Sequence, residues 1–174
     1  MRNIHYIPAL LLALCTLQGF SQTTTIDGIK YTLDSPEAGE ASVSPINNGG
    51  GGYSGQVVIP QTITYNGIEY TVTAIGDNAF KGDDNLTSVS MPLTIESLGD
   101  KAFFQCSGII TIRCDALTPP DVPGESAFHK MDASHVTMIV PGQSIELYAD
   151  LPYWGKFIYN PADDNIPGGE NDHT

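Results

Sequence analysis

Basic side chains are scarce in this sequence of 174 residues, which has seven Lys and Arg against twenty Asp and Glu and a net charge of −13. So negative a chain repels phosphate backbones, and we therefore expect no nucleic acid among its partners. The acidity is typical of a protein that must stay soluble outside the cell. Attraction of basic partners or of Ca²⁺ is the alternative interpretation.

Long apolar runs are absent except near the start of the sequence. The run Ile7–Leu17 follows Arg2, is too short to span a membrane and has the length of a signal-peptide core. Small residues at Gly19 and Ser21 fit cleavage after Ser21. The sequence therefore predicts a signal peptide at residues 1–21, with no transmembrane segment once that peptide is removed.

Catalytic signatures are also missing. The sequence has no Gly-x-Ser-x-Gly elbow, no zinc-protease helix and no nucleophilic cysteine setting, and its carboxylates show no spacing that suggests a glycosidase pair. His129, Asp132 and His135 are close in sequence, but their spacing does not bring them to one face of a regular element, which favours solvated loop residues over a metal site. We expect no catalytic residue, no metal and no cofactor.

A repeat dominates what is present. The segment Ile75–Phe80 returns 23 residues later as Leu98–Phe103. The same shift relates three further pairs of apolar residues, which are Leu86 and Ile109, Val89 and Ile112, and Met91 and Cys114. A fixed period of about 20–50 residues is the signature of a solenoid, in which each coil covers the apolar face of the next.

Each residue type in the repeat has an expected role. Gly76 stands where the chain must turn sharply, and Asp77 is expected to cap a short helical turn by accepting backbone N–H bonds. The second copy repeats both positions. Phe80 and Phe103 should stack in one column and fill the interior between successive coils.

Four short segments alternate apolar and polar residues as half-buried strands do, and we expect them to lie side by side in one sheet. They are Val57–Pro60, Val89–Pro92, Ile112–Cys114 and Met138–Pro141. Their outward positions would align on one face, which is a candidate binding face because solenoids bind through extended faces; ordinary sheet surface is the alternative. These positions are Gln56, Val58, Ser88, Ser90, Thr111, Arg113, Thr137 and Ile139.

Glycine marks three turns or loops outside the repeat. Asp27-Gly28 and Asn66-Gly67 each join two alternating segments, which predicts two-residue β-hairpins because a type I′ turn needs positive φ at both central residues. The first hairpin is expected to cap the N-terminal end of the stack. The segment Asn47–Gly52 lacks the following helix of a phosphate-binding loop, so we expect a flexible connection there.

The repeat pattern breaks at residues 144–159. Ser144 is expected to cap a short helix, and Tyr153 and Trp154 are expected to plug the last coil. An aromatic platform for a sugar or a protein is the alternative for that pair. Residues 162–174 are too polar to pack, which predicts a disordered tail.

The pattern I-G-x-x-A-F, a spacer and L-x-x-V-x-M-P resembles the BspA-type bacterial leucine-rich repeats over most of the chain. Asp83 departs from it, because the family usually carries at that position the cysteine seen here as Cys106. Asp115 departs from it as well, because it replaces the proline seen in the preceding copy as Pro92. The resemblance implies an α/β, β-rich leucine-rich-repeat solenoid of about four short coils at residues 22–161, with an N-terminal β-hairpin cap and a C-terminal aromatic cap.

Cysteine is used sparingly, with three residues in the chain. Cys15 makes a lipid anchor the alternative to simple cleavage, but Leu14 precedes it where such anchors require a small residue. Cys106 and Cys114 remain after cleavage, and both fall at inward positions of the repeat, which favours two buried free thiols. A disulfide formed in an oxidising compartment and a reactive thiol are the alternatives.

We interpret the sequence as a secreted, periplasmic or surface-displayed, non-catalytic binding module for host or bacterial macromolecules, because BspA-type repeats are associated with adhesion. That association is an analogy at the level of the fold. A carbohydrate-binding accessory module for polysaccharide uptake and a purely structural spacer are the alternatives. The expected partner is accordingly a protein or a glycan at the cell exterior.

Export with cleavage after Ser21 leaves a chain that begins at Gln22, lacks Arg2 and carries six basic against twenty acidic residues. The intact mass of protein recovered from culture medium or periplasm should match that chain. Retention of Met1 in exported protein would contradict the prediction, and a diacylglycerol group on Cys15 would show a lipoprotein instead.

Overall fold

The structure, a computed structural model, describes residues 21–35 and 37–162. The predicted signal peptide lies outside the described residues except for Ser21, and the predicted tail lies outside them except for Ala162. Ala162 is buried, and its backbone N–H donates to the Val140 carbonyl at 2.8 Å.

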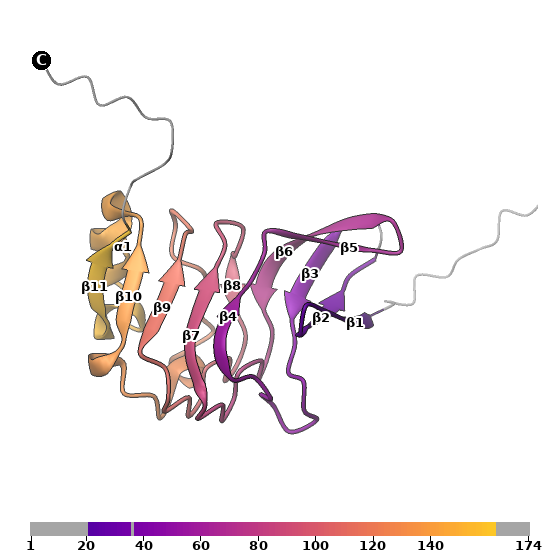
Figure 1. The fold of residues 1–174 in the computed structure, drawn as a ribbon. Coiled ribbons are helices and arrows are strands. Elements are labelled where there is room, and N and C mark those ends of the chain that lie inside the picture. The colour runs from indigo at the N-terminus through magenta and orange to yellow at the C-terminus, as the bar shows by residue number, and fades with distance from the viewer. Residues whose placement is uncertain (1–20, 36, 163–174) are drawn as a thin grey trace, which may run out of the picture.

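Within the described residues, the strands form two sheets (Figure 1). A parallel sheet of five strands has the order β11-β10-β9-β7-β4, and a mixed sheet of six has the order β1-β2-β3-β6-β5 with β8 beside β6. The parallel sheet contains β4 (Gly55–Val58), β7 (Leu86–Met91), β9 (Thr111–Cys114), β10 (Thr137–Val140) and β11 (Ile158–Pro161). The mixed sheet contains β1 (Gln22–Ile26), β2 (Ile29–Leu33), β3 (Glu40–Val43), β5 (Thr62–Tyr65), β6 (Ile68–Ile75) and β8 (Ser97–Leu98).

Short helices fill the connections after β9. They are the 3₁₀ helices η1 (Glu125–Phe128), η2 (Ala133–His135), η3 (Gly142–Ser144) and η4 (Trp154–Lys156), and the α-helix α1 (Ile145–Ala149).

Paired residues of β7 and β9 in the parallel sheet are 23 positions apart, as the sequence repeat predicts. Ser88 of β7 lies beside Thr111 of β9, and Val89 lies beside Ile112 in the same register. Val89 and Ile112 are fully buried, whereas Ser88 and Thr111 are only partly covered. Because successive side chains of a strand point to opposite faces, one row of each strand enters the core and the next faces outward.

Two β-hairpins lie in the mixed sheet. Asp27 and Gly28 join β1 to β2 with φ angles of 49° and 81°, and Asn66 and Gly67 join β5 to β6 with φ angles of 51° and 79°. Positive φ at both central residues is what a type I′ turn requires. Both predicted two-residue hairpins are therefore confirmed.

An aromatic column runs through the interior. Phe80 stacks on Phe103 with ring centroids 5.1 Å apart, and Phe103 stacks on Phe128 at 5.7 Å. Tyr53 packs against Phe80 at 5.0 Å, and Trp154 packs edge-on against Phe128 at 5.1 Å. Phe80 and Phe103 are fully buried, which confirms the predicted stack.

Backbone hydrogen bonds join the same turns. The Phe80 N–H donates to the Ala102 carbonyl and the Phe103 N–H donates to the Ala127 carbonyl, both at 2.8 Å. Adjacent Ala-Phe turns are thus held together by backbone pairing as well as by ring packing.

The predicted helix caps at Asp77, Asp100 and Ser144 are wrong, and turns rather than a helix follow both Asp77 and Asp100. Asp77 Oδ1 accepts the backbone N–H of Asp100 in the next repeat at 2.7 Å. Ser144 precedes α1 but makes no side-chain cap; its hydroxyl donates to the Leu117 carbonyl at 2.8 Å. The Asp77 and Ser144 side chains each bind a neighbouring segment, which competes successfully with the local cap.

The glycine-rich segment Asn47–Gly52 packs on the repeat, so the expectation of a flexible connection is wrong. The Gly51 N–H donates to the Asn78 carbonyl at 3.0 Å, and the Gly52 N–H donates to Asp83 Oδ1 at 2.6 Å. A Cβ atom at Gly51 would clash with Asp83 Oδ1, so the close contact depends on the missing side chain.

Phe80→Ala or Phe103→Ala should lower the free energy of unfolding by about 3–5 kcal/mol, because a rigid stack cannot close the cavity. A domain is stable by roughly 5–15 kcal/mol, so either variant should be close to unfolding. Ser90→Ala and Arg113→Ala lie on the outward side and should change stability by less than about 0.5 kcal/mol. Denaturant melts of the four variants measure the difference, and equally mild effects at Phe80 and Ser90 would contradict the register described above.

Candidate functional site

The eight residues predicted to point outward lie in two rows across the parallel sheet. Neighbouring strands pair so that Gln56, Ser88, Thr111 and Thr137 form one row and Val58, Ser90, Arg113 and Ile139 form the other. We call this surface the outer face. Gln56 and Val58 are exposed, and the other six are half-buried.

The outer face continues onto a strand that the sequence analysis did not predict. β11 pairs with β10 so that Ile158 lies beside Thr137 and Asn160 lies beside Ile139. Ile158 and Asn160 are both exposed. The sequence signal was the short alternating run Ile158–Pro161, which ends in proline as three of the other strand segments do but contains no copy of the repeat motif.

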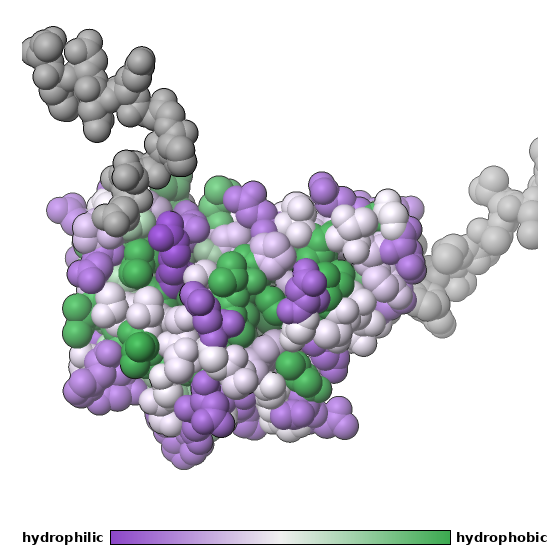
Figure 2. Space-filling view, in the orientation of Figure 1, coloured by the Kyte–Doolittle hydropathy of each residue, from purple (hydrophilic) through white to green (hydrophobic). Residues whose placement is uncertain are grey.

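Small polar groups occupy the middle of the outer face, and apolar side chains lie at its two edges. Val58 is 60% exposed at one edge, and Ile158 is 52% exposed at the other. Arg113 Nε lies 2.8 Å from Asp115 Oδ1, so the positive charge at the centre is neutralised. Figure 2 views the side that carries this sheet and shows apolar, neutral and polar side chains interspersed. Such a surface can bind by contact but supplies no reactive group.

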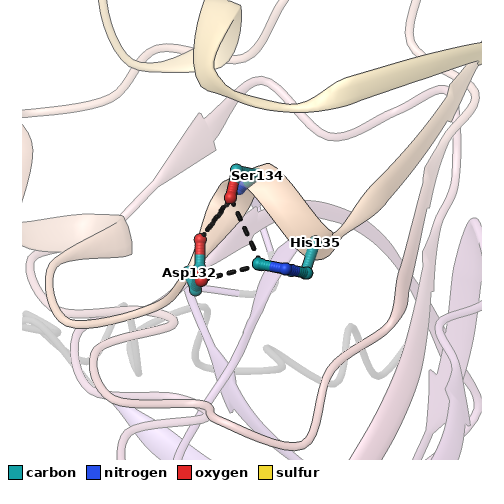
Figure 3. A network of polar contacts seen from close by, with 3 residues as sticks. All are labelled: Asp132, Ser134 and His135. Carbon is teal, nitrogen blue, oxygen red and sulfur yellow. Dashed lines mark hydrogen bonds and ion pairs between the residues drawn. The ribbon is translucent and has the colours of Figure 1, made fainter.

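A Ser–His–Asp cluster lies at η2, but it lacks the geometry of a catalytic triad (Figure 3). His135 Nδ1 lies 2.7 Å from Asp132 Oδ2 and 3.2 Å from Ser134 Oγ, and Ser134 Oγ donates to Asp132 Oδ1 at 2.6 Å. In a triad the two ring nitrogens separate Ser from Asp, whereas here one nitrogen faces both. The Ser134 hydroxyl therefore binds the acid directly and is not activated.

The same cluster has a structural role. Asp132 is the N-cap of η2 and accepts the Ser134 backbone N–H. Hydrogen bonds from Ser134 and then His135 lower the pKa of Asp132. His135 is 81% exposed, as predicted for a solvated loop histidine. Across residues 21–35 and 37–162, no three His, Cys, Asp or Glu side chains gather as a metal site would require.

Trp154 is buried rather than offered as a platform. It is 2% exposed, and its Nε1–H donates to the Pro120 carbonyl at 3.1 Å. Tyr153 is half-buried, with Lys156 Nζ 6.0 Å from its ring centroid. The alternative in which Tyr153 and Trp154 together form an aromatic platform is therefore wrong.

Cys106 and Cys114 are buried and free, which confirms the favoured prediction for the thiols. Cys106 Sγ donates to the Phe80 carbonyl at 2.8 Å, and the Tyr148 hydroxyl lies 3.3 Å from Cys114 Sγ. Burial raises the pKa of Cys106 to about 12 and also raises the pKa of Cys114. Neither side chain forms a thiolate near neutral pH, so neither is a nucleophile.

Asp83 occupies the position of Cys106 one repeat earlier and is also buried. Its carboxylate accepts the backbone N–H of Gly52 at 2.6 Å and that of Tyr53 at 3.1 Å. Burial raises the pKa of Asp83 in spite of these two hydrogen bonds. Because both oxygens bind backbone donors inside the protein, Asp83 is a structural acid.

Known proteins share this repeat and fold. A family model described as BspA type leucine rich repeat region (6 copies) matches residues 60–149, which confirms the resemblance predicted from the sequence. No match was found among curated proteins.

Two solved structures are similar in fold. A leucine-rich repeat protein from Bacteroides capillosus has 21% identity and a TM-score of 0.53, with 80% of this chain and 98% of that chain covered. A leucine rich cell surface protein from Faecalibacterium prausnitzii has 19% identity and a TM-score of 0.51, with 82% of this chain and 43% of that chain covered. Separately, no helix in the described part of the chain is long and apolar enough to cross a membrane.

Cys106 and Cys114 should react with a thiol reagent only after denaturation, when two groups should be labelled. An exposed thiol ionises near pH 9.0, but the raised pKa keeps Cys106 protonated in the folded state up to about pH 12. This contribution to stability is therefore complete below pH 9.0 and is lost as the pH rises toward 12. Labelling of the native protein at pH 8–9 tests the prediction. A mass lower by two hydrogen atoms, restored by reductant, would show a disulfide instead.

Proposed function

Because this chain belongs to the BspA-type leucine-rich repeat family, we propose that it is a non-catalytic module that binds macromolecules at the cell exterior, in the manner of an adhesin. The solenoid fold supports a binding role, since solenoids present extended faces to their partners. The predicted signal peptide supports export, as does the similarity in fold to a cell surface protein of Faecalibacterium prausnitzii.

In this proposal each strand of the parallel sheet marks one coil, which makes five coils rather than about four. The spacing of paired residues is 23 positions from Ser88 to Thr111 and 26 from Thr111 to Thr137, so the period is approximate. The β1–β2 hairpin would close one end of the stack and residues 144–159 the other. Both end segments contribute buried aromatic rings, such as Tyr31 and Trp154.

The outer face is the proposed binding surface. The observation that carries this is the pairing of outward residues from five strands into two uninterrupted rows. The residues that face inward from the same strands, such as Val89 and Ile112, already fill the core. The outward rows are therefore free to meet a partner without disturbing the stack.

A protein partner is favoured over a glycan. Sugar rings are commonly bound by stacking on exposed aromatic side chains, and the ten residues of the two rows include none. Trp154 is buried and cannot serve. The small Ser and Thr side chains allow close approach, and the apolar edges at Val58 and Ile158 add area that a protein surface can cover.

Thr111→Trp should weaken binding to the partner, because it places a large ring at the centre of the outer face. Thr64→Trp on the exposed side of β5 is the matched control and should bind as the wild type does. Both variants and the wild type are applied to arrays of extracellular-matrix proteins and of glycans. We expect the wild type to bind at least one matrix protein and Thr111→Trp to bind it at least about tenfold more weakly.

Unchanged binding by Thr111→Trp would contradict the assignment of the outer face. Binding to glycans alone would favour the polysaccharide accessory module, and binding to neither array would favour a structural spacer. Melts of both variants check that the added ring has not unfolded the protein.

A further inference from the structure

An apolar hollow of about 640 Å³ lies between the two loops that follow β7 and β9. We call it the rim hollow and define it by residues 92–96 and 115–121. Ile95 forms part of its inner wall and is 2% exposed, whereas Leu93 and Leu117 stand on the two loops with 58% and 56% of their surfaces exposed. Single exposed leucines are ordinary, but two of them lining one hollow form an apolar patch of the kind that contacts a partner.

The loop at residues 115–121 is held in place from behind. Three side chains of the C-terminal segment donate to three of its carbonyls. These hydrogen bonds run from Tyr148 Oη to Ala116 (2.9 Å), from Ser144 Oγ to Leu117 (2.8 Å) and from Trp154 Nε1 to Pro120 (3.1 Å). Because the backbone is fixed on both sides of Leu117, this loop cannot easily withdraw its leucine from water.

The loop at residues 92–96 is anchored in the same way. Thr94 Oγ1 donates to the Val72 carbonyl at 2.7 Å, and the Glu96 N–H donates to the Thr73 carbonyl at 2.8 Å. The two loops also join at the base of the hollow, where the Asp121 N–H donates to the Glu96 carbonyl at 2.8 Å. The hollow is therefore formed before any partner arrives, which reduces the conformational entropy lost on binding.

Negative charge surrounds the apolar walls. Glu96 and Asp121 line the hollow and are exposed, and among the described residues neither forms an ion pair. Asp115 also lines it, but its carboxylate is already paired with Arg113. With a net charge of −13 on the whole chain, the surrounding potential attracts cationic segments toward this site.

We propose that the rim hollow is a docking site for a protein segment that inserts an apolar side chain between Leu93 and Leu117 and presents Lys or Arg to Glu96 and Asp121. The negative charge around the hollow favours this occupant over a second copy of the chain, an anionic lipid surface and the chain's own C-terminal residues. A second copy of this chain is equally acidic and would be repelled, as would an anionic lipid surface. The chain's own residues 163–174 contain four carboxylates and no Lys or Arg. The hollow shares no lining residue with the outer face, so the two assignments can fail independently.

A random peptide library displayed on phage and selected on the purified protein tests the proposal. We expect enrichment of peptides that carry an apolar residue next to Lys or Arg. A synthetic copy of an enriched peptide should bind Leu93→Asp/Leu117→Asp at least about tenfold more weakly than the wild type, because the apolar anchor has lost its contacts. Thr111→Trp on the outer face is the matched control and should bind the peptide as the wild type does.

A second double variant tests the proposal even if the aspartates introduced at positions 93 and 117 disturb folding. Glu96→Lys/Asp121→Lys changes only exposed side chains, and this variant should also bind the basic peptide at least about tenfold more weakly than the wild type. The wild-type affinity should fall as salt rises from about 50 mM to about 500 mM, since screening shortens the reach of surface charge. Circular dichroism and melts of each variant confirm that it is folded.

Four outcomes would overturn the proposal. Enriched peptides could lack basic residues, or no peptide could be enriched at all. Peptide binding could be lost in Thr111→Trp but kept in both rim variants, which would move the site to the outer face and support the proposed function alone. Self-association of the wild type that disappears in Leu93→Asp/Leu117→Asp would show that a second copy fills the hollow.

Discussion

Stacking of aromatic rings from one coil to the next is the interaction on which the rest of this structure depends. The rings of Tyr53, Phe80, Phe103 and Phe128 follow one another at 5.0 to 5.7 Å. Strands in a sheet lie about 4.7–4.9 Å apart, so the rings and the backbone ladder share nearly the same spacing. One coil alone would leave each ring half in water, and only the neighbouring coil covers it. Side-chain packing and backbone pairing therefore reinforce each other along the same axis, and neither can shift without the other.

The two repeats differ where their neighbours differ. Cys106 faces the Phe80 carbonyl of a regular coil and donates its S–H to it. Asp83, one repeat earlier, faces the N–H groups of Gly52 and Tyr53 and must accept from both. A thiol is a weak acceptor and could satisfy these donors poorly, whereas a carboxylate has an oxygen for each. The departure from the family pattern at Asp83 thus follows from the irregular segment that packs on the first regular coil.

The 23-residue repeat was enough to predict the strands β7 and β9, the stack of Phe80 on Phe103 and the two buried thiols, because each depends on position within one period. The strands β4 and β10 and the alignment of the eight outward residues were predicted from the alternating apolar pattern of the four strand segments. The hairpins were predicted because Asp-Gly and Asn-Gly turns are local. The bond from Asp77 to the next repeat, the bond from Ser144 to Leu117 and the packing of the glycine-rich segment were missed. Each joins segments more than twenty residues apart, and a local pattern cannot show which distant group competes for a side chain. Strand β11 was missed because it contains no copy of the repeat motif.

The C-terminal segment has a wider role than closing the stack. Trp154 packs on Phe128 and Tyr148, and its indole N–H also holds the carbonyl of Pro120. In the same loop, the Ser144 hydroxyl donates to the Leu117 carbonyl and the Tyr148 hydroxyl donates to the Ala116 carbonyl. The side chains that bury the end of the core are therefore the ones that shape the rim hollow, so core packing and surface shape are coupled there. On the outer face, core packing and surface shape are independent. Inward and outward residues alternate there, so an outward residue can change without altering the stack. The repeat consequently specifies the scaffold in detail while leaving the side chains of the outer face free to vary, whereas the rim hollow inherits its shape from the fold itself.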